Sequence, residues 1–196
     1  MSKILIIVDA QKDFITGSLA VKTAKEKMRK LAKYILNYGE EYSLIVATLD
    51  WHPSTHCSFE KNGGEWPEHC VQDTEGAEFW PPLKAVIEEK GIELLFLTKG
   101  DNEDVEEYSI FKNAKSAEKL LKICKKASTN QIDVCGIALD YCVANTLKDA
   151  VKNGLSKKLS LLKDFSPCIG DDKSIVEFLE DEDVDIIENI DVNGEE

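Results

Sequence analysis

The stretch QIDVCGIALDYCVAN, residues 131–145, decides the fold expected for this chain. Apolar and β-branched residues open it, Gly136 interrupts it, and apolar residues at helical spacing continue to about Asn153. These features predict a strand, a tight turn and a helix with Asp140 as its N-cap. Cys142 would then lie in the first helical turn, where unpaired backbone N–H groups favour a thiolate. It is a candidate nucleophile, although a buried structural cysteine has the same signature.

The rest of the chain repeats the alternation of apolar, β-rich runs with amphipathic helical patterns. Strands are predicted at residues 3–8, 44–49, 94–98, 131–135, 158–162 and 184–187, and helices at about 23–38, 82–90, 115–126, 142–153 and 172–181. Strands that alternate with helices in this way form a parallel sheet covered by helices on both faces. The sequence therefore predicts one three-layer α/β domain that spans residues 1–196.

Composition and charge narrow the class of protein. A hydrophobic content of 43% and a charged content of 31% are typical of a globular protein, and the apolar run at residues 4–8 ends too early to be a signal peptide. A net charge of −13 argues against nucleic acid or an anionic membrane as a partner. The six cysteines include no C-x-x-C pair, which predicts reduced thiols in a cytoplasmic protein. The acidic run at 101–107 is interpreted as a solvated lid face.

All three histidines lie in the long connection between the second and third predicted strands, residues 50–93. The connection opens with DWHPSTH, which contains Asp50, His52 and His56, and His69 follows in WPEH. A carboxylate and two or three imidazoles are suitable ligands for zinc, iron(II) or manganese. In an extended D-x-H segment both side chains point to one side. The cluster therefore predicts a metal site.

Two cysteines in the same connection leave a second interpretation open. Cys57 and Cys70 would make a closed structural zinc site with two of the histidines, which would leave Asp50 unused. A chain built around such a site would be a non-catalytic, zinc-stabilised binding module. Metal removal would then unfold the protein, because closed zinc sites contribute folding free energy.

Charged residues also follow the first and third predicted strands. Asp9 follows the first strand and Lys99 the third. Sites in open α/β sheets lie at the carboxyl ends of strands, near the point where the strand order reverses, so Asp9, Asp50, Lys99 and Cys142 are expected to meet. There an aspartate would take the thiol proton and deliver it to a leaving amine, while a lysine stabilises the thiolate. This combination predicts a cysteine amidase.

The motifs that carry these residues resemble the isochorismatase-like (cysteine hydrolase) superfamily and, within it, the nicotinamidases. They are IIVDAQKDF at Asp9, DWHPSTHCSF at Asp50, GGEWPEHCVQDTEGAEF at His69, TKG at Lys99 and GIALDYCV at Cys142. The resemblance covers essentially the whole chain. It implies a six-stranded parallel sheet in the order 3-2-1-4-5-6. It also implies metal-dependent hydrolysis of nicotinamide, and of pyrazinamide, to the acid and ammonia in NAD salvage. Another small amide is the alternative substrate.

The resemblance also implies how the reaction is catalysed. Asp9, Lys99 and Cys142 would form the catalytic triad, and the reaction would pass through a cysteine thioester. A cis peptide between Ile137 and Ala138 would let the amides of Ala138 and Cys142 form an oxyanion hole.

Metal and substrate ligands follow from the same resemblance. Asp50, His52 and His69 would hold one divalent ion, with zinc expected before iron or manganese, and His56 occupies a position that ligates in some members only. The ion would bind the pyridine nitrogen of nicotinamide. The residues expected around the ring are Phe14, Leu19, Trp66 and Tyr108. A homo-oligomer is also implied.

Overall fold

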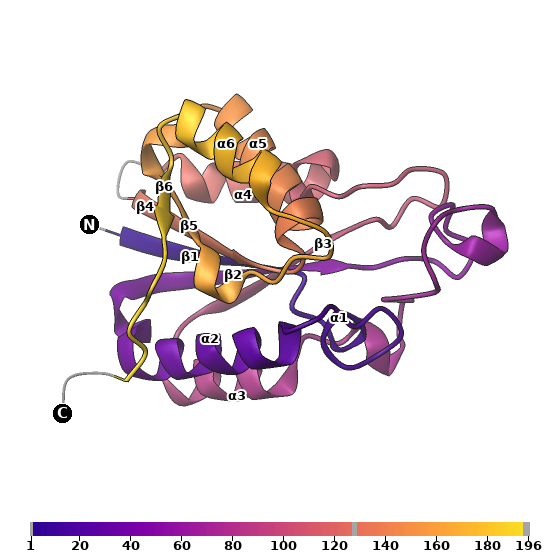
Figure 1. The fold of residues 1–196 in the computed structure, drawn as a ribbon, viewed down its shortest axis with the longest axis horizontal. Coiled ribbons are helices and arrows are strands. Elements are labelled where there is room, and N and C mark those ends of the chain that lie inside the picture. The colour runs from indigo at the N-terminus through magenta and orange to yellow at the C-terminus, as the bar shows by residue number, and fades with distance from the viewer. Residues whose placement is uncertain (1, 127–128, 194–196) are drawn as a thin grey trace.

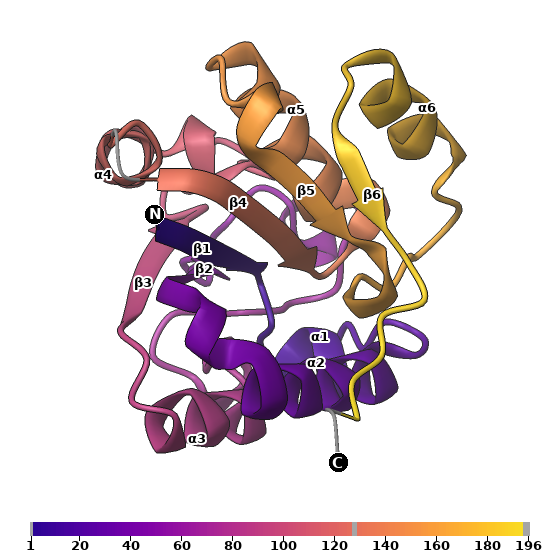
Figure 2. The same cartoon turned by 90° about the vertical axis from the view of Figure 1, so that its left-hand side faces the viewer.

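The computed structural model describes residues 2–126 and 129–193, and within them a parallel sheet runs in the order β3-β2-β1-β4-β5-β6. Figure 2 shows the strands fanned out in that order. The predicted order is confirmed. The strands are β1 (Ser2–Val8), β2 (Tyr42–Asp50), β3 (Leu94–Lys99), β4 (Thr129–Gly136), β5 (Leu159–Leu162) and β6 (Asp185–Ile187). The helices are α1 (Lys12–Ile15), α2 (Ala24–Tyr38), α3 (Pro81–Glu89), α4 (Ala114–Cys124), α5 (Ala144–Lys152) and α6 (Lys173–Asp181).

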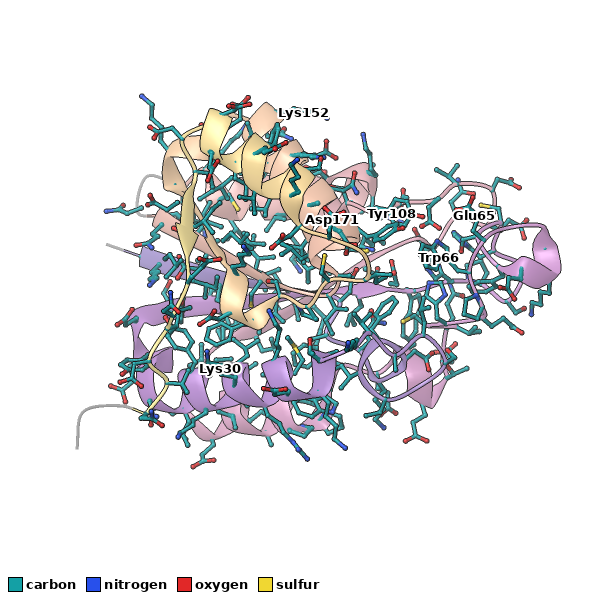
Figure 3. All side chains as sticks on the ribbon, in the orientation of Figure 1. Lys30, Glu65, Trp66, Tyr108, Lys152 and Asp171 are labelled. Carbon is teal, nitrogen blue, oxygen red and sulfur yellow. The ribbon has the colours of Figure 1, made fainter. Side chains whose placement is uncertain are left out.

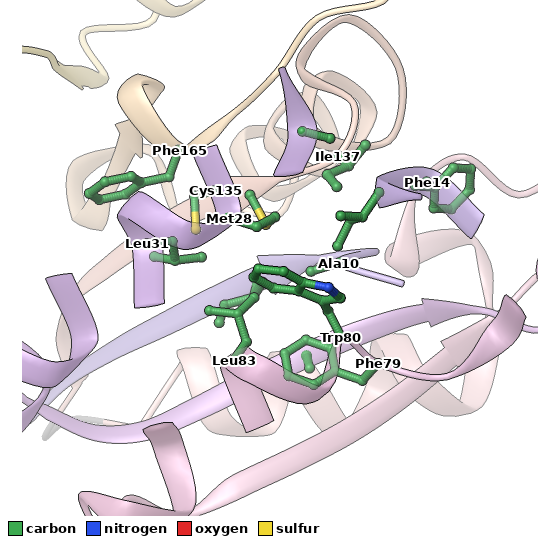
Figure 4. Packing of buried hydrophobic residues seen from close by; sticks show 14 of the residues in the cluster. Ala10, Phe14, Met28, Leu31, Phe79, Trp80, Leu83, Cys135, Ile137 and Phe165 are labelled. Atoms are coloured by element: carbon green, nitrogen blue, oxygen red, sulfur yellow. The ribbon is translucent and has the colours of Figure 1, made fainter. Parts of the chain in front are cut away.

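Helices cover both faces of the sheet, as predicted. Helices α2 and α3 lie on one face, and α4, α5 and α6 lie on the other (Figure 1). Strand β1 is buried on both sides: Leu5 and Ile7 belong to the core under α2 and α3, whereas Ile4 and Ile6 belong to the other core. Figure 4 shows part of the first core, in which Met28 and Leu31 of α2 pack near Leu83 of α3. Continuous apolar runs rather than alternating ones are the expected pattern for such strands.

No helix among residues 2–126 and 129–193 is long and apolar enough to cross a membrane.

The segment after β4 differs from the prediction in one respect. The helical region begins with a π-helical turn, Leu139–Val143, which continues into α5, and Cys142 lies in that turn as expected. Asp140 is not the N-cap. Its carboxylate accepts hydrogen bonds from the backbone N–H groups of Ile169 (3.0 Å) and Gly170 (2.7 Å) in another loop. The N-cap prediction was wrong because these distant N–H groups bind the side chain that a local cap would need.

The direction in which successive strands are added to the sheet reverses between β1 and β4. These two strands approach closely at Gly136 and Val8. Gly136 ends β4 with φ of +126°, and a Cβ atom at this position would overlap the backbone carbonyl of Val8. Only glycine fits both the backbone angle and the space. The expected cis peptide between Ile137 and Ala138 follows directly. The close approach of Gly136 to Val8 therefore sets the path of the chain into the turn that carries Cys142.

We predict that Gly136→Ala destabilises the protein by about 3 kcal/mol or more, because the new methyl group meets backbone that cannot move aside. Urea unfolding measures the loss. Gly154→Ala is the matched control: its φ is also positive, +78°, but nothing lies within 4 Å of the added Cβ. It should cost about 1 kcal/mol. Equal losses in the two variants would show that the close approach to Val8 is unimportant.

Candidate active site

Four ionisable side chains meet at the carboxyl ends of β1, β2 and β3 and at the start of the π-helical turn. Lys99 Nζ lies 2.9 Å from Asp9 Oδ2 and donates a hydrogen bond to Asp50 Oδ1. It also lies 3.5 Å from Cys142 Sγ. Asp50 and Lys99 are direct neighbours in the pairing of β2 with β3. The structure therefore brings together all four strand-end residues singled out from the sequence, and all four are buried.

A threonine that the sequence analysis missed orients Asp9. Thr48 Oγ1 donates a 2.7 Å hydrogen bond to Asp9 Oδ1, and the backbone N–H of Asp9 donates to the carbonyl of Thr48 at 3.1 Å. Asp9 has a φ of +47°, in the left-handed region that non-glycine residues seldom occupy. With one carboxylate oxygen held by Thr48, the other is left facing Lys99.

Burial and charge act differently on the two carboxylates. Burial raises the pKa of Asp9, and the nearby Lys99 only partly offsets this. Burial would also raise the pKa of Asp50, but Lys99 and His52 outweigh it and hold that pKa well below its usual range. Asp50 is therefore the permanent anion of the pair, whereas Asp9 is the carboxylate suited to taking up and releasing a proton.

The Cys142 thiol does not have the lowered pKa that its helical position suggested. Complete burial raises the pKa of Cys142 well above its ordinary value; Lys99 lowers it, but Asp9 and Asp50 add to the rise. Desolvation and two neighbouring carboxylates outweigh the helix terminus and the lysine, both of which favour a thiolate. Deprotonation of Cys142 therefore needs a base beside it, and the carboxylate of Asp9 lies within 4.8 Å of its sulfur.

Asp50, His52 and His69 form a second group next to the first, with ligand atoms within 4.8 Å of one another. His52 Nδ1 lies 2.9 Å from the Gly100 carbonyl, and His69 Nδ1 lies 2.7 Å from the Pro67 carbonyl. Because a carbonyl only accepts, both rings carry their proton on Nδ1 and keep a lone pair on Nε2. His52 Nε2 is buried with no hydrogen-bond partner. Two such nitrogens and a carboxylate fit a divalent metal ion.

His56 is engaged elsewhere. Its Nδ1 lies 2.7 Å from Ser58 Oγ and its Nε2 lies 3.2 Å from the carbonyl of Val105, while its ring packs against His52 at 4.0 Å between centroids. In the part of the chain that the structure describes, His56 does not join the ligand group. It supports the ring of His52 instead.

The closed zinc site with Cys57 and Cys70 receives no support. Neither cysteine belongs to a group of three metal-binding side chains within residues 2–126 and 129–193. All six cysteines are free, as predicted. Burial raises the pKa of Cys70 well above its ordinary value.

Two polar residues of the segment DAQKDF hold the loops of the site in place, and the sequence analysis assigned neither a role. Gln11 is fully buried; its amide donates to the carbonyl of Asp50 at 2.7 Å and accepts from the N–H of Asp50 at 2.8 Å. Asp13 accepts from the N–H of Cys70 at 2.8 Å and from that of Ser18 at 3.2 Å. The feature of the sequence that could have identified Gln11 and Asp13 is their alternate spacing with Asp9 directly after a strand.

A small, mostly apolar pocket opens between the two groups, and together with the open solvent at its mouth it contains about 370 Å³ of empty space. We refer to Asp50, His52 and His69 as the candidate metal-binding group, and two of them, Asp50 and His69, line the pocket. Cys142 and Ala138 line it as well. The four residues expected around a substrate ring all line this pocket: Phe14, Leu19, Trp66 and Tyr108. Trp66 Nε1 donates a 3.0 Å hydrogen bond to the Tyr108 hydroxyl, and Figure 3 shows the two residues at the loop end of the molecule. Phe14 comes from α1, a short helix that is absent from the helices predicted from the sequence.

Part of the acidic run faces inward, contrary to its interpretation as a solvated lid face. Glu106 lines the pocket, where burial and the nearby Asp50 raise its pKa. Glu107 is buried and accepts a 2.8 Å hydrogen bond from the N–H of Gly100. Residues 101–105 are exposed as expected. The run therefore turns its last two carboxylates toward the site and brings Tyr108 into the pocket.

Comparison with known proteins agrees with this geometry. The isochorismatase domain model matches residues 3–157. The nicotinamidase of Saccharomyces cerevisiae is 31% identical over 208 residues, which cover 92% of this chain and 94% of that protein. The nicotinamidase/pyrazinamidase of Mycobacterium tuberculosis is 38% identical over 160 residues, covering 79% and 82%. The chain therefore belongs to the isochorismatase family, and the expectation of a hydrolase is confirmed.

Solved structures show the same relationship. PnC1 from L. infantum in complex with nicotinate superimposes with a TM-score of 0.82 at 32% identity, covering 95% of this chain and 92% of that one. The pyrazinamidase of Pyrococcus horikoshii in complex with zinc gives a TM-score of 0.79 at 34% identity, covering 95% and 99%. The resemblance to nicotinamidases read from the motifs is thereby confirmed.

We predict that His52→Ala and His69→Ala each weaken zinc binding by at least about 100-fold, because each removes a ligand with a free Nε2. His56→Ala should weaken it by no more than about tenfold, since His56 acts through the ring of His52. Competition with a chelating dye measures the three affinities. A loss in His56→Ala equal to that in His52→Ala would make His56 a direct ligand.

Proposed function

We propose that this protein is a metal-dependent nicotinamidase, which hydrolyses nicotinamide to nicotinic acid and ammonia in NAD salvage and also accepts pyrazinamide. The observation that carries the proposal is the shared position of Asp50. It contacts Lys99 in the group around Cys142 and belongs to the group with His52 and His69, and both groups border one small aromatic pocket. The relatives named nicotinamidase or pyrazinamidase support the same substrate class.

The residues around Cys142 would carry the covalent chemistry. Asp9 takes the thiol proton, and the sulfur attacks the carboxamide carbon while Lys99 balances the negative charge. Backbone N–H groups of Ala138 and Cys142 would stabilise the oxyanion. Asp9 then passes its proton to the leaving nitrogen, the C–N bond breaks, and ammonia departs. Water hydrolyses the remaining thioester to the acid and restores the thiol.

The residues around His52 would orient the substrate. Asp50, His52 and His69 would hold a divalent ion, with zinc expected first and iron or manganese as alternatives. When bound, such an ion supplies a Lewis acid that a heteroaromatic nitrogen can ligate. Phe14, Leu19, Trp66 and Tyr108 would enclose the flat ring and keep its amide in reach of Cys142.

We predict that Cys142→Ala lowers ammonia release from nicotinamide by at least about 10⁴-fold, because it removes the nucleophile. Asp9→Asn should lower kcat by at least about 100-fold, because it removes the base that the buried thiol needs. A coupled ammonia assay measures both. Cys57→Ser is the control and should retain full activity, since Cys57 does not line the pocket.

Activity that survives in Cys142→Ala would contradict the nucleophile assignment. Absence of ammonia release in the parent protein with its metal bound would contradict nicotinamide as the substrate and direct attention to other small amides.

We predict that chelation of the metal abolishes ammonia release while changing Tm by no more than a few degrees, because the apolar cores on both faces of the sheet are built from side chains other than Asp50, His52 and His69. Differential scanning fluorimetry and the ammonia assay before and after chelation, and after zinc is added back, provide the test. Unfolding on chelation would instead favour a zinc-stabilised binding module.

A further inference from the structure

A second hollow adjoins the pocket and shares part of its lining. Together with the open solvent at its mouth it contains about 360 Å³ of empty space, against about 370 Å³ for the pocket counted in the same way. Four side chains line both spaces: Leu19, Val21, Trp66 and Ile169. The two spaces therefore adjoin at these side chains, and we refer to the second as the outer hollow.

The outer hollow differs chemically from the pocket. The pocket holds the ionisable groups Asp50, His69, Glu106 and Cys142, whereas among residues 2–126 and 129–193 Lys22 is the one charged residue that lines the outer hollow. Lys22 is exposed, so its ammonium group is free to point into solvent. The other two residues particular to the outer hollow are Ala20 and Cys168. Burial, together with Asp140, raises the pKa of the Cys168 thiol to about 12, which keeps it uncharged.

Of the four shared side chains, Val21 is buried in the core under α2 and α3, whereas Leu19 and Ile169 are not fully buried. Ile169 is 46% exposed although it is a large apolar residue, and Leu19 is half-buried. The backbone beneath Ile169 is fixed, because its N–H and that of Gly170 donate to the carboxylate of Asp140. A side chain that can turn on a fixed backbone permits a ligand group to pass from one space to the other.

We propose that the outer hollow is a subsite for an apolar substituent on the ring of an aromatic carboxamide. This inference rests on the proposed function, since it places the ring in the pocket and the amide at Cys142. An apolar group is favoured because five apolar side chains and a neutral thiol line the hollow. Ring-substituted carboxamides with a short alkyl chain are therefore expected as substrates besides nicotinamide itself.

Steady-state kinetics with nicotinamide and its propyl derivatives, one for each free ring carbon, test the subsite in the metal-loaded protein. At least one derivative should be hydrolysed with kcat/KM within about tenfold of nicotinamide. Ala20→Trp should then lower kcat/KM for that derivative by at least about tenfold while leaving nicotinamide unchanged, because Ala20 lines only the outer hollow. Ala20→Ser, which adds little volume, is the matched control and should alter neither value.

Cys168→Phe fills the hollow from the opposite side and should repeat the effect of Ala20→Trp. Unchanged nicotinamide turnover in these variants shows that they fold. Rejection of every propyl derivative by more than about tenfold, or equal losses for both substrates in Ala20→Trp, would overturn the subsite while leaving the proposed function intact. If the parent protein did not hydrolyse nicotinamide, the proposed function would fail, and the subsite with it.

Discussion

The site depends on the ion pairs that the buried ammonium group of Lys99 forms with Asp9 and Asp50. Two carboxylates and a thiol lie around this ammonium group, and all of these groups are removed from water. Burying an unpaired ion costs several kcal/mol, and removing one partner of a buried pair typically costs about 3–5 kcal/mol. The ends of β1, β2 and β3 are therefore held together by charge as well as by the sheet. Although burial alone would lower the pKa of Lys99, Asp50 and Asp9 keep it well above its ordinary value, so the cation persists.

Asp50 links this cluster to the candidate metal-binding group, and the link explains why two carboxylates so close together can differ in behaviour. One oxygen of Asp50 contacts Lys99, and the other lies 3.6 Å from His52 Nε2. Lys99 lowers the pKa of Asp50, and His52 lowers it further, so this carboxylate stays ionised. Asp9 has only Lys99 and the hydroxyl of Thr48, so burial dominates and its pKa rises. This separation of two carboxylates by their surroundings is the general means by which one site provides both a fixed anion and a proton carrier.

The sequence predicted the features that depend on local pattern. Apolar runs gave the six strands, and the rule that sites gather at strand ends brought Asp9, Asp50, Lys99 and Cys142 together. Gln11, Asp13 and Thr48 escaped notice because their roles depend on backbone or side-chain groups of segments distant in sequence. Asp140 and Glu106 were misread for the same reason: a cap signal and a charge run have local meanings that tertiary contacts override. The state of the Cys142 thiol depended on burial, which a helical position alone does not reveal.

Trapping a covalent intermediate on Cys142 tests the central claim most directly. Metal-loaded protein would be mixed with nicotinamide, quenched in acid during the first turnover and digested for peptide mass spectrometry. We expect a nicotinoyl thioester on the peptide that carries Cys142 and on no peptide that carries another cysteine. Turnover of nicotinamide without acylation of Cys142 at any quench time would contradict nucleophilic catalysis by this thiol.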